Sequence, residues 1–205
     1  MKTVYDDTMT MREARKKYFD VNGFGENGGY DDAWVDFKLG PVPMPFPNTQ
    51  GRVRAVKFHD LHHILTDFDT DVAGEFEISA WEIAAGCKSF GAAWVLNLGG
   101  LAAGALFRCP ARTFRAFVRG RREETTYGHD LEEMLDLSVK EARERFAPLT
   151  GKDAPKASAS DVALFVVSVV TGLAVGLMEL AFVLPLVPIG LTMNYFRRRS
   201  EAAAT

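Results

Sequence analysis

Three of the four histidines in this chain, His59, His62 and His63, lie within five positions, together with Asp60. An α-helix turns by about 100° per residue, so His59 and His63 lie about 40° apart on one face. Asp60 lies about 100° from His59, and His62 falls on the other flank. Two imidazoles and a carboxylate are ligand types that bind divalent metals in proteins. The stretch therefore predicts part of a metal site on one helix.

A further oxygen ligand must come from a second element. The polar run 66–71 could fold the chain back so that Glu75 reaches the histidines. Glu82 follows seven residues later and shares the face of Glu75, which makes it the alternative acid for the same site. Histidines on a helix surface are more often hydrogen-bonded neighbours than ligands, and that interpretation stays open here. The spacing of His59 and His63 favours a ligand pair, because two imidazoles one turn apart converge on one point.

The elements that would position these residues are predominantly helical. Strand signals are weak, and the four alternating prolines of 41–47 exclude a helix or a central strand there. Glycines in 22–29 indicate turns, and Asp130 has the place of a helix cap. Helices are predicted at 11–19, 52–65, 71–87, 113–122 and 131–146. The predicted fold class is all-α, a single helical domain with an apolar C-terminal helix or hairpin.

Composition limits the classes of function. A chain of 205 residues with a net charge of −3 can bury one sizeable core, and its scattered basic residues do not indicate nucleic-acid binding. Cys87 and Cys109 are too few and too far apart for a disulfide framework or a thiolate metal site. The N-terminus has no secretory signal pattern. A reducing compartment fits these features.

Two apolar blocks raise the question of a membrane. Residues 89–107 carry no charge, and residues 162–193 carry only Glu179. The first block is predicted to be a buried core helix rather than a span. The second is predicted to associate with a membrane, as a single transmembrane helix, a re-entrant hairpin or a hydrophobic dimerisation tail. The basic end 197–199 favours the cytoplasmic side, of a bacterial inner membrane or a mitochondrial inner membrane.

These features divide the chain into four parts. Residues 1–50 hold the N-terminal helix and the extended proline segment, and residues 51–150 hold the helical metal-binding core. Residues 151–160 have linker composition, and residues 161–205 form the apolar tail with its basic end.

The motif residues resemble a known family. His59-Asp60-x-x-His63, followed after eleven residues by Glu75, is similar to the signature of the coenzyme Q biosynthesis protein 4 family. Gly74 and the later Arg119-Gly120 agree with that context, and the resemblance covers about residues 51–146. The N-terminal proline run and the apolar tail depart from the family pattern.

The resemblance implies a helical, membrane-associated protein of ubiquinone biosynthesis. The family is linked to oxidative C1 decarboxylation of a polyprenylated hydroxybenzoate, which would make the chain a lyase acting on an isoprenoid lipid. It implies His59, Asp60, His63 and Glu75 as metal ligands, with zinc as the usual ion and iron or magnesium as alternatives. Zinc has no redox chemistry, so oxidation would need oxygen with an electron-rich ring, or iron.

The expected partners are a prenylated aromatic lipid or quinone precursor, the membrane, other quinone-biosynthesis enzymes and a second copy in a homodimer. The alternative function is a non-catalytic, prenyl-lipid-binding scaffold that organises those enzymes. The glycine-rich block 90–107 could line a groove for the prenyl chain or could only admit a neighbouring helix. Both interpretations stay open at this point.

Overall fold

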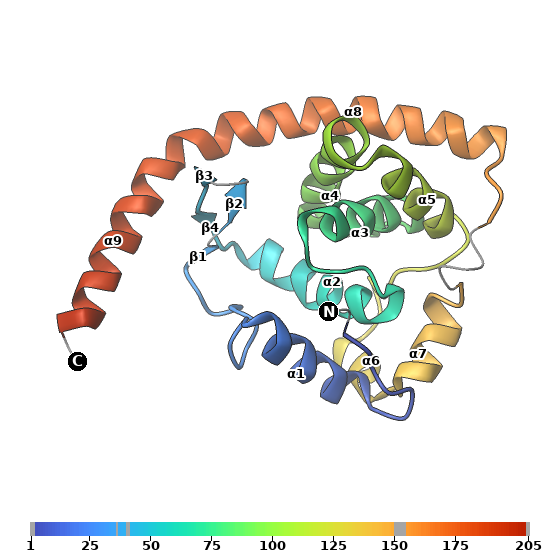
Figure 1. The fold of residues 1–205 in the computed structure, drawn as a ribbon, viewed down its shortest axis with the longest axis horizontal. Helices are drawn as coiled ribbons and strands as arrows, with labels where there is room; N and C mark the ends of the chain where they lie inside the picture. The colour runs from blue at the N-terminus through green and yellow to red at the C-terminus, as the bar shows by residue number, and fades with distance from the viewer. Residues whose placement is uncertain (1–2, 36, 40–41, 150–154, 204–205) are drawn as a thin grey trace.

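The computed structural model describes residues 3–35, 37–39, 42–149 and 155–203, and its fold is all-α as predicted (Figure 1). The helices are α1 Met11–Asn22, α2 Gln50–Thr66, α3 Val72–Ala85, α4 Gly91–Ala103, α5 Pro110–Gly120, α6 Leu131–Asp136, α7 Val139–Phe146, α8 Ala159–Val183 and α9 Val187–Ala203. The proline segment forms two short antiparallel ladders. They pair β1 Trp34–Val35 with β4 Phe46–Pro47, and β2 Lys38–Leu39 with β3 Val42–Pro43.

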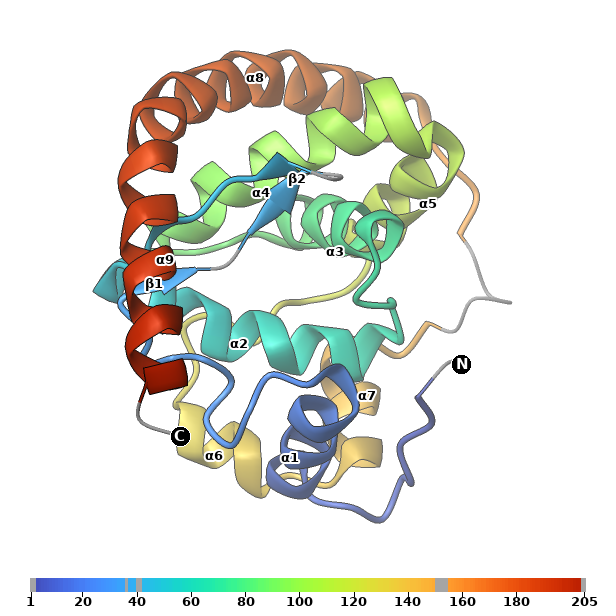
Figure 2. The ribbon, with the colours of Figure 1, turned by 60° about the vertical axis from the view of Figure 1, so that its left-hand side comes forward.

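The hydrophobic core includes the N-terminal helix. Met11, Tyr18 and Phe19 of α1 are buried in the same cluster as Leu61 of α2 and Trp81 of α3. Helix α2 lies between α1 below and the α3–α4 pair above in both ribbon views (Figure 2). The helix that carries the histidines is therefore enclosed by the rest of the domain, which fixes the position of its side chains.

The prediction of a single helix at 131–146 is wrong, because the structure has two helices there, α6 and α7. Leu137 is extended, and its carbonyl accepts a hydrogen bond from the Met11 N–H at 2.8 Å. The Ser138 hydroxyl accepts from the Glu141 N–H, and the Glu141 carboxylate accepts from the Ser138 N–H. This capping box starts a new helix at Val139. The apolar repeat alone predicts one continuous helix across this position. Asp130 caps α6, as predicted.

The glycines of α4 are used for helix packing. A side chain at Gly100 or Gly104 would collide with Ser79 or Phe76 of α3, and one at Gly99 would collide with α8. Neighbouring helices thus approach α4 closely on two sides. Of the two interpretations of the glycine-rich block, close helix packing is the one that the described residues show.

Gly120 marks another close approach, between α5 and α3. A Cβ atom there would meet the main-chain carbonyl of Trp81. We expect Gly120→Ala to lower the free energy of unfolding by about 1–3 kcal/mol, because main-chain atoms cannot move aside cheaply. Gly51→Ala is the matched control, since a Cβ atom at Gly51 meets open space. It should change stability by no more than about 1 kcal/mol. Equal losses in denaturant unfolding would contradict this view of the α3–α5 contact.

The apolar tail is one curved run of helix rather than a hairpin. Helix α8 continues through the short 3₁₀ helix η2 Leu184–Leu186 into α9; in Figure 1, α8 lies across the top of the domain and α9 descends at the left. The stretch Ala159–Met193 is long and apolar enough to cross a membrane, judged by length and composition alone. Residues 150–154 of the predicted linker lie outside the described residues. Ser158 caps α8, so the helix already begins at Ala159.

Candidate metal centre

Three of the predicted ligands lie together between α2 and α3. The Nε2 atoms of His59 and His63 are 3.2 Å apart, and the Glu75 carboxylate oxygens lie 3.4 Å and 3.3 Å from them. In a tetrahedral site with metal–ligand bonds of about 2.05 Å, neighbouring ligand atoms lie about 3.3 Å apart. The two Nε2 atoms have this separation, and each faces a different oxygen of the Glu75 carboxylate, so the residues present fit a divalent metal ion held by both imidazoles and that carboxylate.

The connection between the two helices brings Glu75 to the histidines. Asp67 takes a left-handed conformation with φ 58° at the end of α2, which turns the chain. The Asp71 side chain then accepts the Gly74 N–H at 2.7 Å and caps α3. Gly74 lies against the main chain of Asp69, where a Cβ atom would collide. The tight turn at Gly74 places Glu75 in the first turn of α3, opposite the imidazoles.

The imidazoles are oriented by acceptors on their far side. The His59 Nδ1–H donates to the Glu82 carboxylate at 2.8 Å, and the His63 Nδ1–H donates to the Phe68 carbonyl at 3.0 Å. A neutral imidazole carries one N–H, so these bonds leave the Nε2 lone pairs facing each other and Glu75. Two lone pairs and a carboxylate that converge in this way favour a cation between them.

The charges around His59 also favour a cation at the site. Burial alone would lower the pKa of His59, but the carboxylates of Glu82 and Glu75 raise it well above its usual value. Burial would raise the pKa of Glu75, and the neighbouring His63 and His59 lower it instead. The pocket thus stabilises one positive charge, carried by a proton or by a metal ion.

Asp60 lies beside this group but has another partner. Its buried carboxylate accepts a hydrogen bond from the Tyr30 hydroxyl at 2.5 Å, and burial raises its pKa. The cluster that meets metal-ligand spacing consists of His59, His63 and Glu75. The assignment of Asp60 as a fourth ligand stays a prediction.

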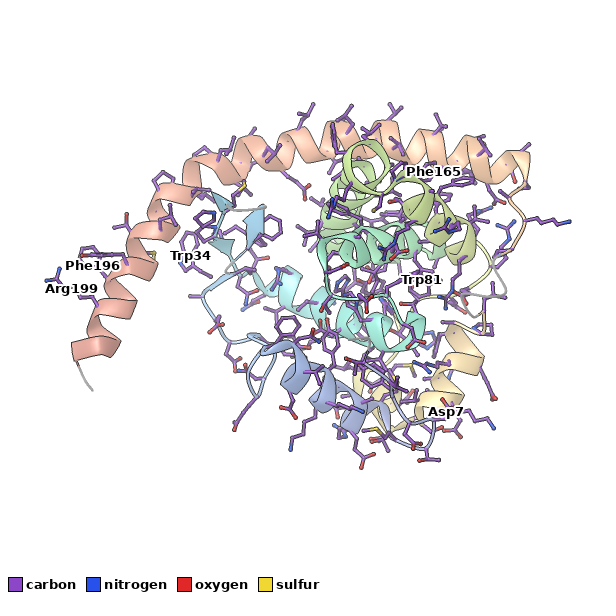
Figure 3. All side chains as sticks on the ribbon, viewed as in Figure 1. Asp7, Trp34, Trp81, Phe165, Phe196 and Arg199 are labelled. Carbon is purple, nitrogen blue, oxygen red and sulfur yellow. The ribbon has the colours of Figure 1, made fainter. Side chains whose placement is uncertain are left out.

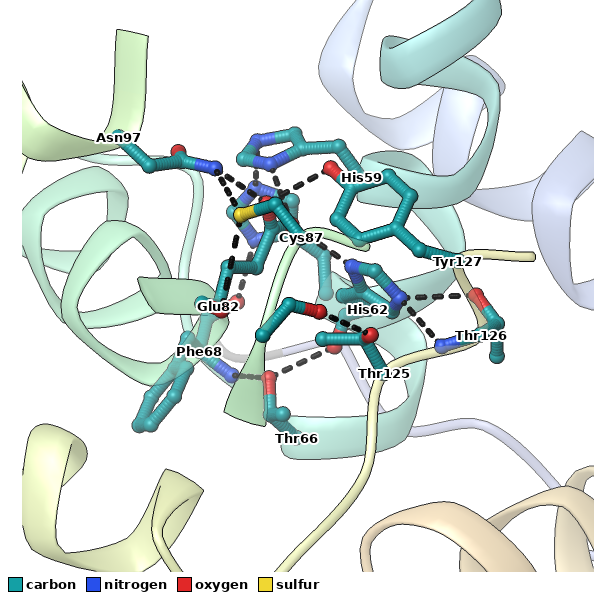
Figure 4. A network of polar contacts seen from close by, with 12 residues as sticks. His59, His62, Thr66, Phe68, Glu82, Cys87, Asn97, Thr125, Thr126 and Tyr127 are labelled. Carbon is teal, nitrogen blue, oxygen red and sulfur yellow. Dashed lines mark hydrogen bonds and ion pairs between the residues drawn. The ribbon is translucent and has the colours of Figure 1, made fainter. Parts of the chain in front are cut away.

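Glu82, the alternative acid, lies at the Nδ1 side of His59, away from Glu75 (Figure 4). Its side chain is 0% exposed, and it accepts hydrogen bonds from four side chains. The donors are His59 Nδ1 at 2.8 Å, His62 Nδ1 at 2.7 Å, the Tyr127 hydroxyl at 2.7 Å and the Asn97 amide. Glu82 therefore orients His59 and leaves Glu75 as the acid that faces both histidines.

His62 is a structural residue. Its Nδ1 bonds to Glu82, and its Nε2 accepts the Thr126 N–H at 3.0 Å. Sequence reasoning placed it on the other flank but missed its partner Thr126, and it missed Asn97 and Tyr127, which donate to Glu82. Asn97 carried a signal, because it is the only amide side chain in the apolar block 90–107.

The site opens on the side of Glu75. The exposed fraction of the side chain is 1% for His63, 18% for His59 and 43% for Glu75. Three protein donors with an exposed side leave a coordination position for water or a substrate, which is typical of catalytic rather than structural zinc sites. A cavity of about 600 Å³, partly lined by Tyr18 and Asp67, adjoins His63 on another side.

No model of a protein family, no curated protein and no solved structure matches the chain. The likeness to the coenzyme Q biosynthesis protein 4 family therefore depends on the residues of the motif alone. The structure contributes separate observations, which are the helical fold and the convergence of His59, His63 and Glu75.

Proposed function

We propose that the chain binds one divalent metal ion through His59, His63 and Glu75, and that it acts at a membrane in quinone biosynthesis. The reaction proposed is oxidative C1 decarboxylation of a polyprenylated hydroxybenzoate. The observation that carries the metal site is the convergence of the two Nε2 atoms, 3.2 Å apart, on the Glu75 carboxylate, whose Oε2 lies 3.4 Å from His59 and whose Oε1 lies 3.3 Å from His63. The choice of substrate is supported by the resemblance of the motif.

The donor charges suit an anionic substrate. A bound ion would act as a Lewis acid that holds the substrate carboxylate or phenolate and offsets its charge. Two neutral imidazoles and one carboxylate leave one net positive charge on a divalent ion, which an anionic ligand would balance. Glu82 and the Phe68 carbonyl hold the imidazoles in orientation, so the ligand geometry need not reorganise when a substrate binds.

The donor set bears on the identity of the metal. Two histidines and one glutamate bind zinc in hydrolytic enzymes, and two histidines with one carboxylate also bind iron(II) in enzymes that use oxygen. Replacing a ring carboxyl by a hydroxyl is an oxidation, for which zinc supplies no redox chemistry. Zinc stays the first expectation from the resemblance, and iron is the metal that the proposed reaction favours.

Turnover by the purified full-length protein tests the proposal. We expect protein loaded with iron(II) or zinc, in air, to convert a prenylated hydroxybenzoate and water into the ring-hydroxylated product and carbon dioxide. The two electrons released would reduce dioxygen to hydrogen peroxide, and mass spectrometry measures the ring product. His63→Ala, treated in the same way, should give only the background rate, because it lacks one of the three donors. Absence of metal binding by the wild-type chain would overturn the proposal.

The alternative function is a prenyl-lipid-binding scaffold without catalysis. The glycines expected to line a groove for the prenyl chain are taken up by contacts with α3 and α8, so this block does not distinguish the enzyme from the scaffold. Binding of metal and prenylated lipid, with no product from either metal, would support the scaffold and exclude the enzyme. Binding and product formation can both be measured on the same purified samples.

A further inference from the structure

One face of helix α8 is attached to the domain along its length, and the contact continues as far as Gly190 in α9. Less exposed residues recur at helical spacing along α8 and on into α9, which defines a continuous inner face. The inner face includes Asp161, Phe165, Gly172, Gly176, Glu179 and Gly190.

Charge and aromatic contacts hold the first turns of α8. The Asp161 carboxylate accepts two hydrogen bonds from the Arg122 guanidinium, at 2.8 Å and 2.6 Å. The Phe165 ring packs against Phe114 and Phe117 of α5, with ring centroids 5.0 Å and 5.3 Å away, and lies on the domain side of α8 in Figure 3. The tail is thus fixed to α5 where it begins.

Small residues bring the rest of the tail close to the domain. A Cβ atom at Gly172 would collide with the Leu98 carbonyl of α4, and one at Gly190 would collide with Pro45 of the proline segment. From Asp161 to Gly190 the helix rises by about 1.5 Å per residue, so the attached stretch is about 40 Å long. That exceeds the hydrocarbon core of a bilayer, which is about 30 Å thick. The stretch Ala159–Met193, which is long enough to cross a membrane, is therefore packed against the domain along one face from Asp161 to Gly190.

The one carboxylate of the apolar stretch, Glu179, also faces the domain. It is the single charged residue of 162–193, and it lies on the inner face, half-buried against Gly99 of α4. The outer face is apolar, with Val166, Val170 and Phe182 exposed, Phe182 by 75%. A carboxylate within an apolar helix argues against lipid contact only if it faces the lipid. Here it faces the protein.

We propose that the outer face of α8 lies in the plane of an anionic phospholipid membrane, immersed on one side, and does not cross the bilayer. Phe107 is 80% exposed and lies in the segment between α4 and α5, two helices that both pack on α8. Arg108 and Arg115, in that segment and in α5, are exposed, as is Arg199 in α9 beyond the apolar stretch. An apolar helical face together with exposed arginines is typical of helices that lie in the interface of anionic membranes.

This placement goes beyond the proposed function and does not depend on it. It does fix where the metal centre would lie, because α4 separates α8 from α3. Packed helices lie about 8–10 Å apart, so the axis of α3 lies about 20 Å from that of α8. With the outer face of α8 in the membrane, two helix layers, α8 and α4, would separate the lipid from the helix that carries Glu75.

Nitroxide labels on the full-length protein can measure the depth of the outer face. We would replace Cys109 by serine, so that the buried Cys87 is the remaining native thiol, and introduce single cysteines at Val166, Val170 and Leu177. The control is Val21, an exposed valine on α1, which lies across the domain from α8 in both ribbon views. Power saturation of the spin signal with oxygen and a water-soluble nickel chelate reports depth in vesicles of phosphatidylcholine and phosphatidylglycerol.

We expect the three α8 labels to share one shallow depth, about 5–10 Å below the headgroups, and the Val21 label to stay in water. Depths that increase towards the bilayer centre along α8 would show a crossing helix and overturn the proposal. Water exposure of all labels would also overturn it, as would spin–spin broadening between two copies without lipid contact.

Discussion

Replacing His63 by alanine is expected to reduce the bound divalent metal from about one ion per chain to background. The His63 Nε2 atom lies 3.2 Å from that of His59 and 3.3 Å from the Glu75 carboxylate, so its loss removes one of the three donor groups. Two remaining donors, one of them on a 43% exposed side chain, cannot exclude water from the ion. Elemental mass spectrometry after loading with zinc or iron(II) and dialysis gives the stoichiometry.

His129→Ala is the matched control, because His129 packs on Phe146 and belongs to none of the site contacts. It should keep the full stoichiometry, and equal metal content in His63→Ala and the wild type would show that the ligand assignment is wrong. Asp60→Asn addresses the fourth ligand that the family resemblance implies. If Asp60 serves only as the acceptor for Tyr30, this variant keeps its metal.

The sequence predicted the parts of the site that depend on local geometry. His59 and His63 are one turn apart in a helix that the structure places at 50–66, and a polar connector returns the chain to bring Glu75 opposite them. The different roles of Glu75 and Glu82 could not be predicted, because residues seven apart share a helical face. They lie about 10 Å apart along α3, so they reach different sides of His59. That difference depends on how α3 crosses α2.

The tail illustrates a second limit of sequence reasoning. Length and apolar composition predicted contact with a membrane, but they did not show which face of the helix the domain would hold. The inner face depends on tertiary contacts such as Phe165 with Phe114, which no local pattern reveals. The break at Leu137 has a local cause instead, since Ser138 and Glu141 form a capping box that the amphipathic repeat concealed.

Removing the Glu82 carboxylate should cause the largest loss of stability of any single change considered. We expect Glu82→Ala to lower the free energy of unfolding by about 3–5 kcal/mol, because it leaves buried donors without their acceptor. These donors belong to His59, His62, Tyr127 and Asn97. Denaturant unfolding of the metal-free protein measures the loss. Glu124→Ala is the control, an exposed glutamate 3.5 Å from Lys88, and should cost no more than about 1 kcal/mol.

Glu82→Gln separates the structural role of this residue from its effect on the metal. The amide keeps the size of the side chain but weakens the acceptor for the His59 Nδ1–H, which should reduce metal affinity about 10- to 100-fold. At a metal concentration of about 100 times the wild-type dissociation constant, binding stabilises the wild type by about 2.7 kcal/mol. The variant should gain about 0.4–1.4 kcal/mol under the same conditions. An equal gain in both proteins would mean that the hydrogen bond from His59 to Glu82 does not tune the site, and that Glu82 serves the fold alone.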